Sequence, residues 1–262
     1  MDVIRVVVTG ATGRMGGEVA RALAAEPGLE LVGLVSRKAS AGRLPGWEGI
    51  PAAPTVGELL DQVQADVLVD FTVAEVAFEN ARAALRRRVA PVIGTSGLTP
   101  DQVAAIAEKA QTVGVGGAVV PNFAVGAVLM MHLAKQAARF FDAAEIIELH
   151  HDGKADAPSG TALATARLLA EARPEGFRRN VPAKEPLPGS RGAELAGISI
   201  HAVRLPGLVA HQEVIFGGRG QTLTIRHDST SRESFIPGVL LAVRRVMETR
   251  QFYFGLESIL GL

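Results

Sequence analysis

Short apolar runs alternate with segments of helical periodicity between residues 3 and 119. The runs predict strands at residues 3–9, 29–35, 66–71, 91–94 and 115–119. The periodic segments predict helices at residues 14–25, 56–63, 74–88 and 100–111, and residues 45–54 are expected to form a Gly- and Pro-rich loop. Continuously apolar strands that alternate with helices are typical of a parallel sheet covered on both faces. This part of the chain is therefore predicted to be a doubly wound α/β unit.

The pattern changes after Pro121. We expect a helix over about 124–141, a strand at 143–150, a helix at 159–172, a long loop at 174–195, strands at 197–204, 208–216 and 221–228, and a final helix at about 232–249. The last two strands are joined by Gly217-Gly218-Arg219-Gly220, and strands joined by so short a Gly turn pair antiparallel. The pattern predicts a second, smaller α+β domain built on a mixed or antiparallel sheet.

Composition restricts the function. Of the 262 residues, 48% are hydrophobic and 21% are charged, which is typical of a globular protein with a substantial core. The 27 Lys and Arg balance the 27 Asp and Glu, so there is no general attraction to nucleic acid or to an anionic membrane. The absence of cysteine excludes disulfides, thiolate nucleophiles and cysteine metal sites.

Membrane and secretory segments are not expected. Residues 113–134 carry no charged side chain and are long enough for a membrane helix, but Pro121-Asn122 interrupts them, so a strand, a turn and a helix are predicted instead. The first residues show an acid at position 2 and no cleavage site, which favours a cytoplasmic protein.

A glycine-rich segment follows the first predicted strand directly, as Gly10-Ala11-Thr12-Gly13-Arg14-Met15-Gly16. Glycines at such a position let the backbone approach a pyrophosphate, and the free amides at the helix start attract anions. The GxxGxxG spacing alone also fits an ordinary tight turn, but its place at the first strand of a βαβ pattern predicts dinucleotide binding.

The end of the second predicted strand bears on the choice of dinucleotide. It reads Ser36-Arg37-Lys38, and no acid lies between Glu30 and Glu48. An acid here favours the free ribose of NADH, whereas a basic residue suits the 2′-phosphate of NADPH. We therefore expect NADPH as the preferred cofactor, with NADH possible; the alternative is a solvated basic loop.

Polar loops follow the next two strands, as Asp70-Phe71-Thr72 and Gly94-Thr95-Ser96-Gly97. The carboxyl ends of parallel strands face the ligand crevice of an open sheet, so these loops are placed to contact the nicotinamide half of the cofactor.

The segment from Glu148 to Ala162 concentrates the side chains that carry chemistry. It reads Glu148-Leu-His150-His151-Asp-Gly-Lys154-Ala-Asp-Ala-Pro-Ser159-Gly160-Thr161-Ala162. A histidine can donate a proton near neutral pH, a lysine can hold a carboxylate, and a helix start can bind an anion. This combination suits the reduction of an anionic, unsaturated substrate. Two alternatives are surface polarity and a metal site, although adjacent histidines point to opposite sides of an extended chain and lack helical i, i+4 spacing.

These motifs, together with Pro121-Asn-Phe-Ala-Val-Gly126, resemble those of the 4-hydroxy-tetrahydrodipicolinate reductase (dihydrodipicolinate reductase) family of lysine and diaminopimelate biosynthesis. The resemblance covers nearly the whole chain, and its most specific part is the His-His-x-x-Lys-x-Asp-Ala-Pro-Ser-Gly-Thr-Ala segment. It implies a Rossmann-like nucleotide domain of residues 1–122 plus 231–262, a substrate-binding and oligomerisation domain of residues 123–230, and a homotetramer formed through the sheets of the second domain.

The implied reaction is transfer of hydride from NADPH or NADH to carbon 4 of a cyclic dicarboxylate imine, with loss of the 4-hydroxyl group as water. By resemblance, His150 is the proton donor and Lys154 the second catalytic residue, and no metal takes part. The residues implied at the substrate carboxylate are His151, Ser159, Gly160 and Thr161. The residues expected at the cofactor are Gly10, Ala11, Thr12, Gly13, Arg14, Met15, Ser36, Arg37, Lys38, Phe71, Gly94, Thr95, Ser96, Val120, Pro121, Asn122, Phe123, Arg232 and Phe235.

The sequence departs from the family pattern at three positions. Ser36 stands where many members carry an acid, which strengthens the expectation of NADPH, and Pro121 and Ala124 stand where Ala and Ser are usual. Two other functions remain open from the residues alone. One is another two-domain NADP-dependent dehydrogenase, such as one acting on diaminopimelate or homoserine, and the other is a dinucleotide sensor without turnover.

Overall fold

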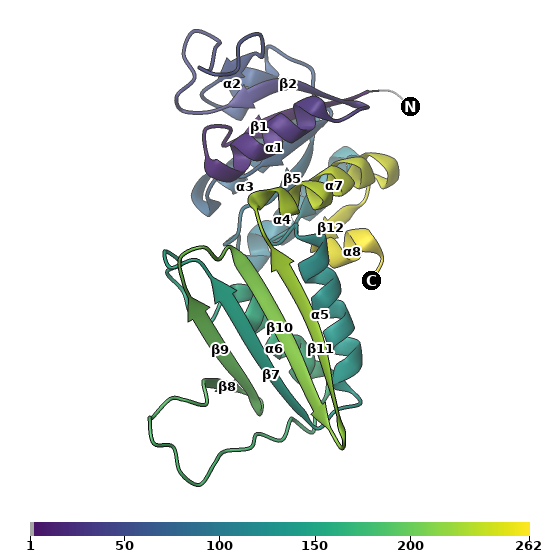
Figure 1. The fold of residues 1–262 in the computed structure, drawn as a ribbon. Helices are drawn as coiled ribbons and strands as arrows, with labels where there is room; N and C mark the ends of the chain where they lie inside the picture. Colours follow the sequence, from purple (N-terminus) through teal and green to yellow (C-terminus); the bar gives the residue numbers. More distant parts are fainter. Residues whose placement is uncertain (1–2) are drawn as a thin grey trace. The chain divides into compact units, whose positions relative to one another are not determined.

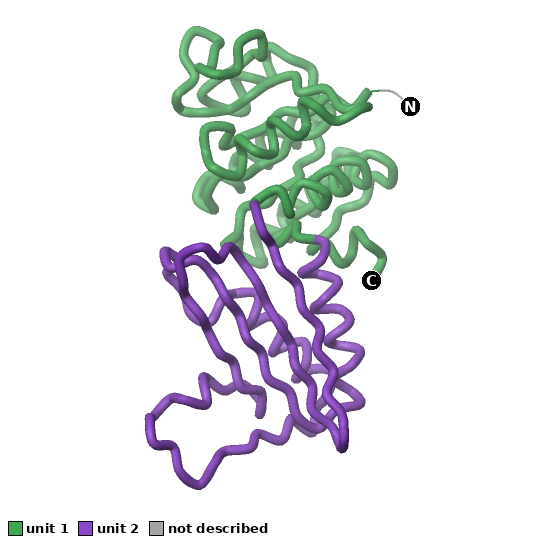
Figure 2. Tube along the Cα trace, in the orientation of Figure 1, with its two compact units in different colours: residues 1–124, 232–262 green, residues 125–231 purple. Residues whose placement is uncertain are grey.

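The computed structural model describes residues 3–262 and divides into two compact units (Figure 2). Unit 1 comprises residues 1–124 and 232–262, and unit 2 comprises residues 125–231. The chain passes from one unit to the other after residues 124 and 231. The domain boundaries expected from the sequence, after residues 122 and 230, lie within two residues of these positions.

Unit 1 is built on a seven-stranded sheet with the order β12-β6-β5-β4-β1-β2-β3, in which every pair of neighbours is parallel. Its strands are β1 (Ile4–Thr9), β2 (Leu29–Val35), β3 (Ala52–Ala53), β4 (Val67–Asp70), β5 (Ala90–Ile93), β6 (Gly117–Val119) and β12 (Phe252–Phe254). Its helices are α1 (Arg14–Ala25), α2 (Val56–Leu60), α3 (Ala74–Arg86), α4 (Pro100–Val113), the 3-10 helix η1 (Arg232–Phe235), α7 (Ile236–Thr249) and α8 (Leu256–Leu260).

The central strands of this sheet are buried along their length, which explains their continuous apolar runs. Val6, Val7 and Val8 of β1 are fully buried, as are Val67 and Val69 of β4. The order places β1 between β2 and β4, so the strand order reverses there, as in a doubly wound Rossmann-like sheet. This confirms the predicted α/β class of the first unit.

Two strands of unit 1 were not expected. The segment at residues 45–54, predicted as a loop, contributes the two-residue strand β3, and the aromatic tail forms β12 at the opposite edge. Gly117 explains why β12 fits against β6: a Cβ atom at Gly117 would lie 3.1 Å from Cδ2 of Phe252. Both strands depend on a partner far along the chain.

Unit 2 is a five-stranded mixed sheet with the order β11-β10-β7-β9-β8 (Figure 1). Its strands are β7 (Ala143–His150), β8 (Ala193–Leu195), β9 (Ile198–Arg204), β10 (Ala210–Gly218) and β11 (Gln221–Ser229), and its helices are α5 (Val125–Ala138) and α6 (Gly160–Ala172). Only β7 and β9 pair in parallel, whereas β10 and β11 form the predicted antiparallel hairpin. The predicted mixed α+β class is confirmed, with β8 as an extra strand at the end of the expected loop.

Helices α5 and α6 cover one face of this sheet (Figure 1). Alternate residues of β7 point to that face, so Ala144 and Ile146 are buried there with Val214 and Phe216 of β10. Glu148 lies on the same face of β7 and is also fully buried, which makes it the exception in an apolar row. Within residues 3–262, no helix is long and apolar enough to cross a membrane.

Candidate functional site

The glycine loop between β1 and α1 can be formed only with glycine at two of its positions. Gly10 has a φ of 74°, and a Cβ atom there would lie 2.7 Å from the carbonyl oxygen of Phe71. A Cβ atom at Gly16 would lie 2.2 Å from the carbonyl oxygen of Gly10. The helix start is thus packed directly against the loop backbone, with no space for a side chain at either position.

The start of α1 is free to bind an anion. Its N-cap is Gly13, no side chain caps the helix, and its first turn carries no acid. Thr12, Gly13 and Arg14 are exposed, whereas Ala11 is buried. Uncapped amides and the positive end of the helix dipole attract phosphate, so the loop fits the pyrophosphate of a dinucleotide.

The end of β2 joins this loop through Ser36. Its buried hydroxyl lies 3.1 Å from Oγ1 of Thr12 and accepts the backbone N–H of Lys38 at 3.2 Å. Arg37 and Lys38 are exposed, and in the described part of the chain neither side chain forms an ion pair or hydrogen bond. Their positive charges are therefore available to a ligand beside Thr12.

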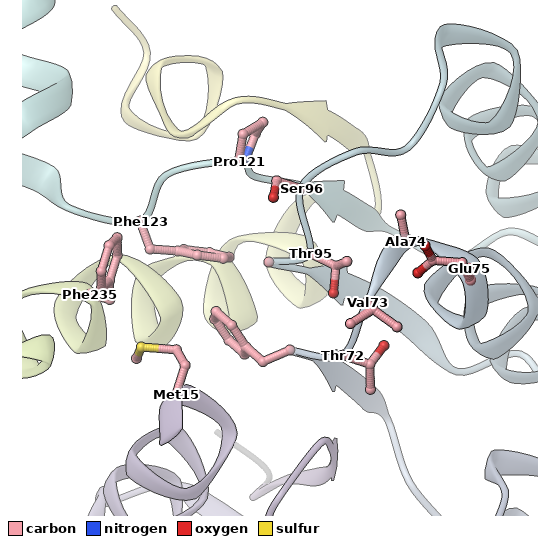
Figure 3. A pocket seen from close by; sticks show the side chains of 12 residues that line it. Met15, Thr72, Val73, Ala74, Glu75, Thr95, Ser96, Pro121, Phe123 and Phe235 are labelled. Atoms are coloured by element: carbon pink, nitrogen blue, oxygen red, sulfur yellow. The ribbon is translucent and has the colours of Figure 1, made fainter. Parts of the chain in front are cut away.

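A cavity of about 510 Å³ opens at the carboxyl ends of β4 and β5 (Figure 3). It is lined by Met15, Phe71, Thr72, Val73, Ala74, Glu75, Gly94, Thr95, Ser96, Pro121, Phe123 and Phe235. The rings of Phe71 and Phe123 have their centroids 5.6 Å apart, and a Cβ atom at Gly94 would lie 2.3 Å from the Phe71 ring. The cavity thus brings together eight of the residues predicted at the cofactor, from five separate segments of the chain.

Three other predicted cofactor residues are placed differently. The Val120 side chain is fully buried, so only its backbone could contact a ligand. Oδ1 of Asn122 accepts the backbone N–H of Ala124 at 3.0 Å and so fixes the turn before α5. Arg232 is exposed at the start of η1, three residues before the Phe235 that lines the cavity.

The chemistry-bearing segment of unit 2 begins at the end of β7, where the carboxylate of Glu148 meets the ring of His150. Oε2 of Glu148 lies 2.5 Å from Nδ1 of His150, and Oε1 accepts the backbone N–H of Ser159 at 3.0 Å. One buried carboxylate therefore fixes both the histidine ring and the residue that caps α6.

Arg204 completes the site from β9. Its Nη1 and Nη2 atoms donate to the two carboxylate oxygens of Glu148 at 2.8 and 2.7 Å. Nη2 also donates to the carbonyl oxygen of Asp156 at 2.7 Å, which ties the loop after β7 to the same group. The parallel register pairs His150 with Arg204, so sheet pairing places the guanidinium beside the histidine.

The electrostatics of this cluster act on His150 in opposite directions. Burial lowers the pKa of His150, and the charges of Lys154 and Arg204 lower it further, whereas the Glu148 carboxylate opposes this; the net pKa is below the usual value. Burial raises the pKa of Glu148, but hydrogen bonds from Arg204, His150 and the Ser159 amide outweigh it and hold the pKa below its usual range. Glu148 is thus an anion beside a histidine that loses its proton more readily than usual.

The remaining predicted substrate residues surround the start of α6. Lys154 donates to Asp156 at 2.7 Å, and His151 is exposed. The Ser159 hydroxyl caps the helix by accepting the N–H of Ala162 at 3.1 Å, and the first turn carries no acid. No atom lies within 4 Å of where a Cβ atom at Gly160 would stand, so there is open space at this helix start.

Glu148 and Arg204 are the residues of this cluster that the sequence analysis did not select. Alternation along the predicted strand could have found Glu148, because residues 148 and 150 share a face of β7. Arg204 gave no such signal, since its position depends on the pairing of β7 with β9. Among residues 3–262, no group of three or more His, Cys, Asp or Glu could hold a metal ion.

Comparison with known proteins gives matches over the whole chain. Family models described as dihydrodipicolinate reductase, N-terminus and C-terminus, match residues 4–123 and 126–260. A 4-hydroxy-tetrahydrodipicolinate reductase of Dehalococcoides mccartyi is 49% identical and covers 100% of both chains, and one of Moorella thermoacetica is 49% identical and covers 98% of both.

A solved structure agrees with these sequence matches. It is a dipicolinate-bound dihydrodipicolinate reductase from Paenisporosarcina sp. TG-14, with 42% identity and a TM-score of 0.90 over 99% of this chain and 100% of that one. The family models cover both units, and the relatives match along their full length. The chain therefore belongs to the dihydrodipicolinate reductase family.

Proposed function

We propose that the chain is an oxidoreductase that reduces 4-hydroxy-tetrahydrodipicolinate to tetrahydrodipicolinate with loss of water, as a step of diaminopimelate and lysine biosynthesis. The observation that carries this proposal is the cluster in which Glu148 and Arg204 hold His150 beside Lys154 and the open start of α6. A proton donor, a cation and free helix amides in one place suit an anionic substrate that must gain a proton.

A bound NADPH or NADH would supply the hydride. The uncapped start of α1 would bind the pyrophosphate, and the cavity lined by Phe71, Thr95 and Phe123 would hold the nicotinamide. The steric requirement for glycine at residues 10 and 16 supports this, because a side chain there would collide with the backbone that forms the cradle. The residues proposed for the cofactor lie in unit 1, and the proposed proton donor His150 lies in unit 2.

His150 would donate the proton through Nε2. Its Nδ1 atom is engaged by Glu148, so the other ring nitrogen is left to face a substrate. Because burial and two nearby cations lower the pKa of His150, its proton is released more readily than that of a free imidazole. Lys154, the second catalytic residue of the proposal, would leave Asp156 for the substrate.

The start of α6 would bind a carboxylate of the substrate. Gly160 and Thr161 begin the first turn of α6, a Cβ atom added at Gly160 would meet nothing within 4 Å, and the exposed His151 can add a donor. The dipicolinate bound by the Paenisporosarcina relative is itself a cyclic dicarboxylate, which supports a ligand of this class.

NADPH would be preferred to NADH, with both usable. The support is that Ser36 carries no charge at the end of β2, while the free guanidinium of Arg37 and ammonium of Lys38 are exposed beside it. A 2′-phosphate there would meet positive charge and no carboxylate.

The second unit would assemble a homotetramer through its sheet. Helices α5 and α6 cover one face, and the alternation of β7 and β10 places Ile147, Leu149 and Ile215 on the other, where each is partly exposed. Apolar side chains on an open sheet face favour burial against another copy.

We also propose a cytoplasmic location, because a biosynthetic enzyme meets its nicotinamide cofactor and precursors there.

The test is an NADPH-oxidation assay coupled to dihydrodipicolinate synthase, which generates the substrate, with NADH in a parallel series. Oxidation that depends on the synthase supports the proposal. NADPH binding without oxidation would instead indicate a dinucleotide sensor, and oxidation only with diaminopimelate or homoserine pathway substrates would indicate another dehydrogenase.

A further inference from the structure

A fully buried carboxylate, Asp70, ends β4 beneath the cavity of unit 1. Its Oδ1 atom accepts the backbone N–H of Thr72 at 2.9 Å, the Thr72 hydroxyl at 2.6 Å and the Thr95 hydroxyl at 2.9 Å. Its Oδ2 atom accepts the side-chain amide of Asn80 at 2.8 Å. Four donors converge on one carboxylate, which is the arrangement that satisfies a buried anion.

The charge of Asp70 is not neutralised by a cation. Within residues 3–262, Asp70 forms no ion pair, whereas the equally buried Glu148 is held by the guanidinium of Arg204. Hydrogen-bond dipoles stabilise an anion without cancelling its charge, and interactions in a site away from water are screened weakly. Asp70 therefore acts on its surroundings as a fixed negative charge.

The donors to Asp70 form part of the cavity wall. Thr72 and Thr95 both line the cavity (Figure 3). Both donate their hydroxyl protons to Oδ1 of Asp70. The Asp70 carboxylate is therefore hydrogen-bonded directly to two side chains that line the cavity, without lining it itself. The other carboxylate at this cavity, Glu75, is exposed, so solvent screens it.

We infer that Asp70 is a positioning residue whose charge stabilises the oxidised, cationic form of a nicotinamide in this cavity over the reduced, neutral form. This inference rests on the proposed function. Loss of a hydride removes two electrons and one hydrogen nucleus from the dihydronicotinamide, so the ring gains one positive charge while the substrate carbon gains the hydride. Asp70 exchanges no proton or electron; it lowers the energy of the charge that develops.

The experiment compares the Kd values of NADPH and NADP⁺ without substrate, by NADPH fluorescence and by competition with NADP⁺. In Asp70→Asn, which removes the charge and keeps the shape, the ratio of the NADP⁺ Kd to the NADPH Kd should rise roughly tenfold, the order expected for one weakly screened charge. Asn80→Ala is the matched control, because it removes the hydrogen bond from the Asn80 amide to Oδ2 of Asp70 but keeps the carboxylate. The ratio of the two Kd values in this variant should equal that of the unaltered protein.

A second variant covers the case in which Asp70→Asn does not fold. Asn80→Lys brings a cation to the atom that the amide now contacts, and it should raise the same ratio. If Asp70→Asn or Asn80→Lys folds and binds both dinucleotides with an unchanged ratio of the NADP⁺ Kd to the NADPH Kd, the inference about Asp70 is overturned, but the proposed function is not. Failure of the unaltered protein to bind either dinucleotide overturns the proposed function as well.

Discussion

The Oε2 atom of Glu148 lies 2.5 Å from Nδ1 of His150 at the end of β7. The two residues are two positions apart on one strand, so their side chains share a face of the sheet. Arg204 of β9 donates hydrogen bonds to the same carboxylate from both of its Nη atoms. Removing one partner of a buried ion pair costs about 3–5 kcal/mol, so loss of either Glu148 or Arg204 should destabilise this end of β7. The ring of His150 is therefore oriented by Glu148, which Arg204 holds in turn.

Replacing His150 by Gln should reduce kcat by roughly a hundred- to ten-thousand-fold, the usual worth of a general acid. Lys154→Ala should also reduce turnover, because the substrate loses a cation. Binding of NADPH should be unchanged in both, since the glycine loop lies in the other unit. Steady-state kinetics and NADPH fluorescence titration measure the two effects, with Asp152→Asn as a control in the same exposed turn. Near-normal kcat in His150→Gln would rule out its assignment as proton donor.

Glu148→Gln and Arg204→Met should move the pH dependence of kcat/KM in opposite directions. Glu148 raises the pKa of His150 and Arg204 lowers it, so the first variant lowers that pKa and the second raises it. The active form of a proton donor is protonated, so activity is lost as pH rises through its pKa. The descending limb should therefore shift to lower pH in Glu148→Gln and to higher pH in Arg204→Met. If Glu148 and Arg204 had only a structural role, both variants would lose activity, but the descending limbs of their pH profiles would coincide.

The cofactor preference should depend on Arg37. Arg37→Ala should lower kcat/KM for NADPH by roughly tenfold, the value of one lost charge-assisted hydrogen bond, and leave that for NADH nearly unchanged. Ser36→Asp should act in the same direction, because it places a carboxylate where the 2′-phosphate would bind. Arg86→Ala, at the exposed end of α3, is the matched control. An unchanged NADPH to NADH ratio in Arg37→Ala would remove the basis for the preference.

Gly16→Ala should destabilise the protein by about 1–3 kcal/mol and weaken dinucleotide binding, because its Cβ atom would overlap the carbonyl oxygen of Gly10. Gly57→Ala in α2 is the control: its Cβ atom would meet nothing closer than 3.8 Å, so stability should be unchanged or slightly higher. Urea unfolding and NADPH titration report the two effects. Equal stability of the two variants would contradict a close approach at the glycine loop.

Local pattern predicted the larger elements well. Helix α1 (Arg14–Ala25) and strand β7 (Ala143–His150) have the bounds that periodicity predicts, because their apolar faces repeat over several turns or alternations. The strands that were missed, β3, β8 and β12, have two or three residues each. Strands β3 and β12 form only by pairing with β2 and β6, and their own residues give no indication of those partners. Strand β8 pairs with the adjacent β9 across the two-residue turn Ala196-Gly197.

Local sequence was enough to recognise the glycine loop, the polar strand ends and the His150–Lys154 segment, since each is a run of neighbouring residues whose chemistry follows from its local backbone. Glu148 was also within reach of strand alternation. Tertiary structure alone decided that Arg204 is the cation on Glu148, because β9 reaches β7 only after α6 and a long loop. It likewise gathered Met15, Phe123 and Phe235 around one cavity. Contacts between distant segments depend on which strands pair and which helices pack, and short-range pattern does not encode that choice.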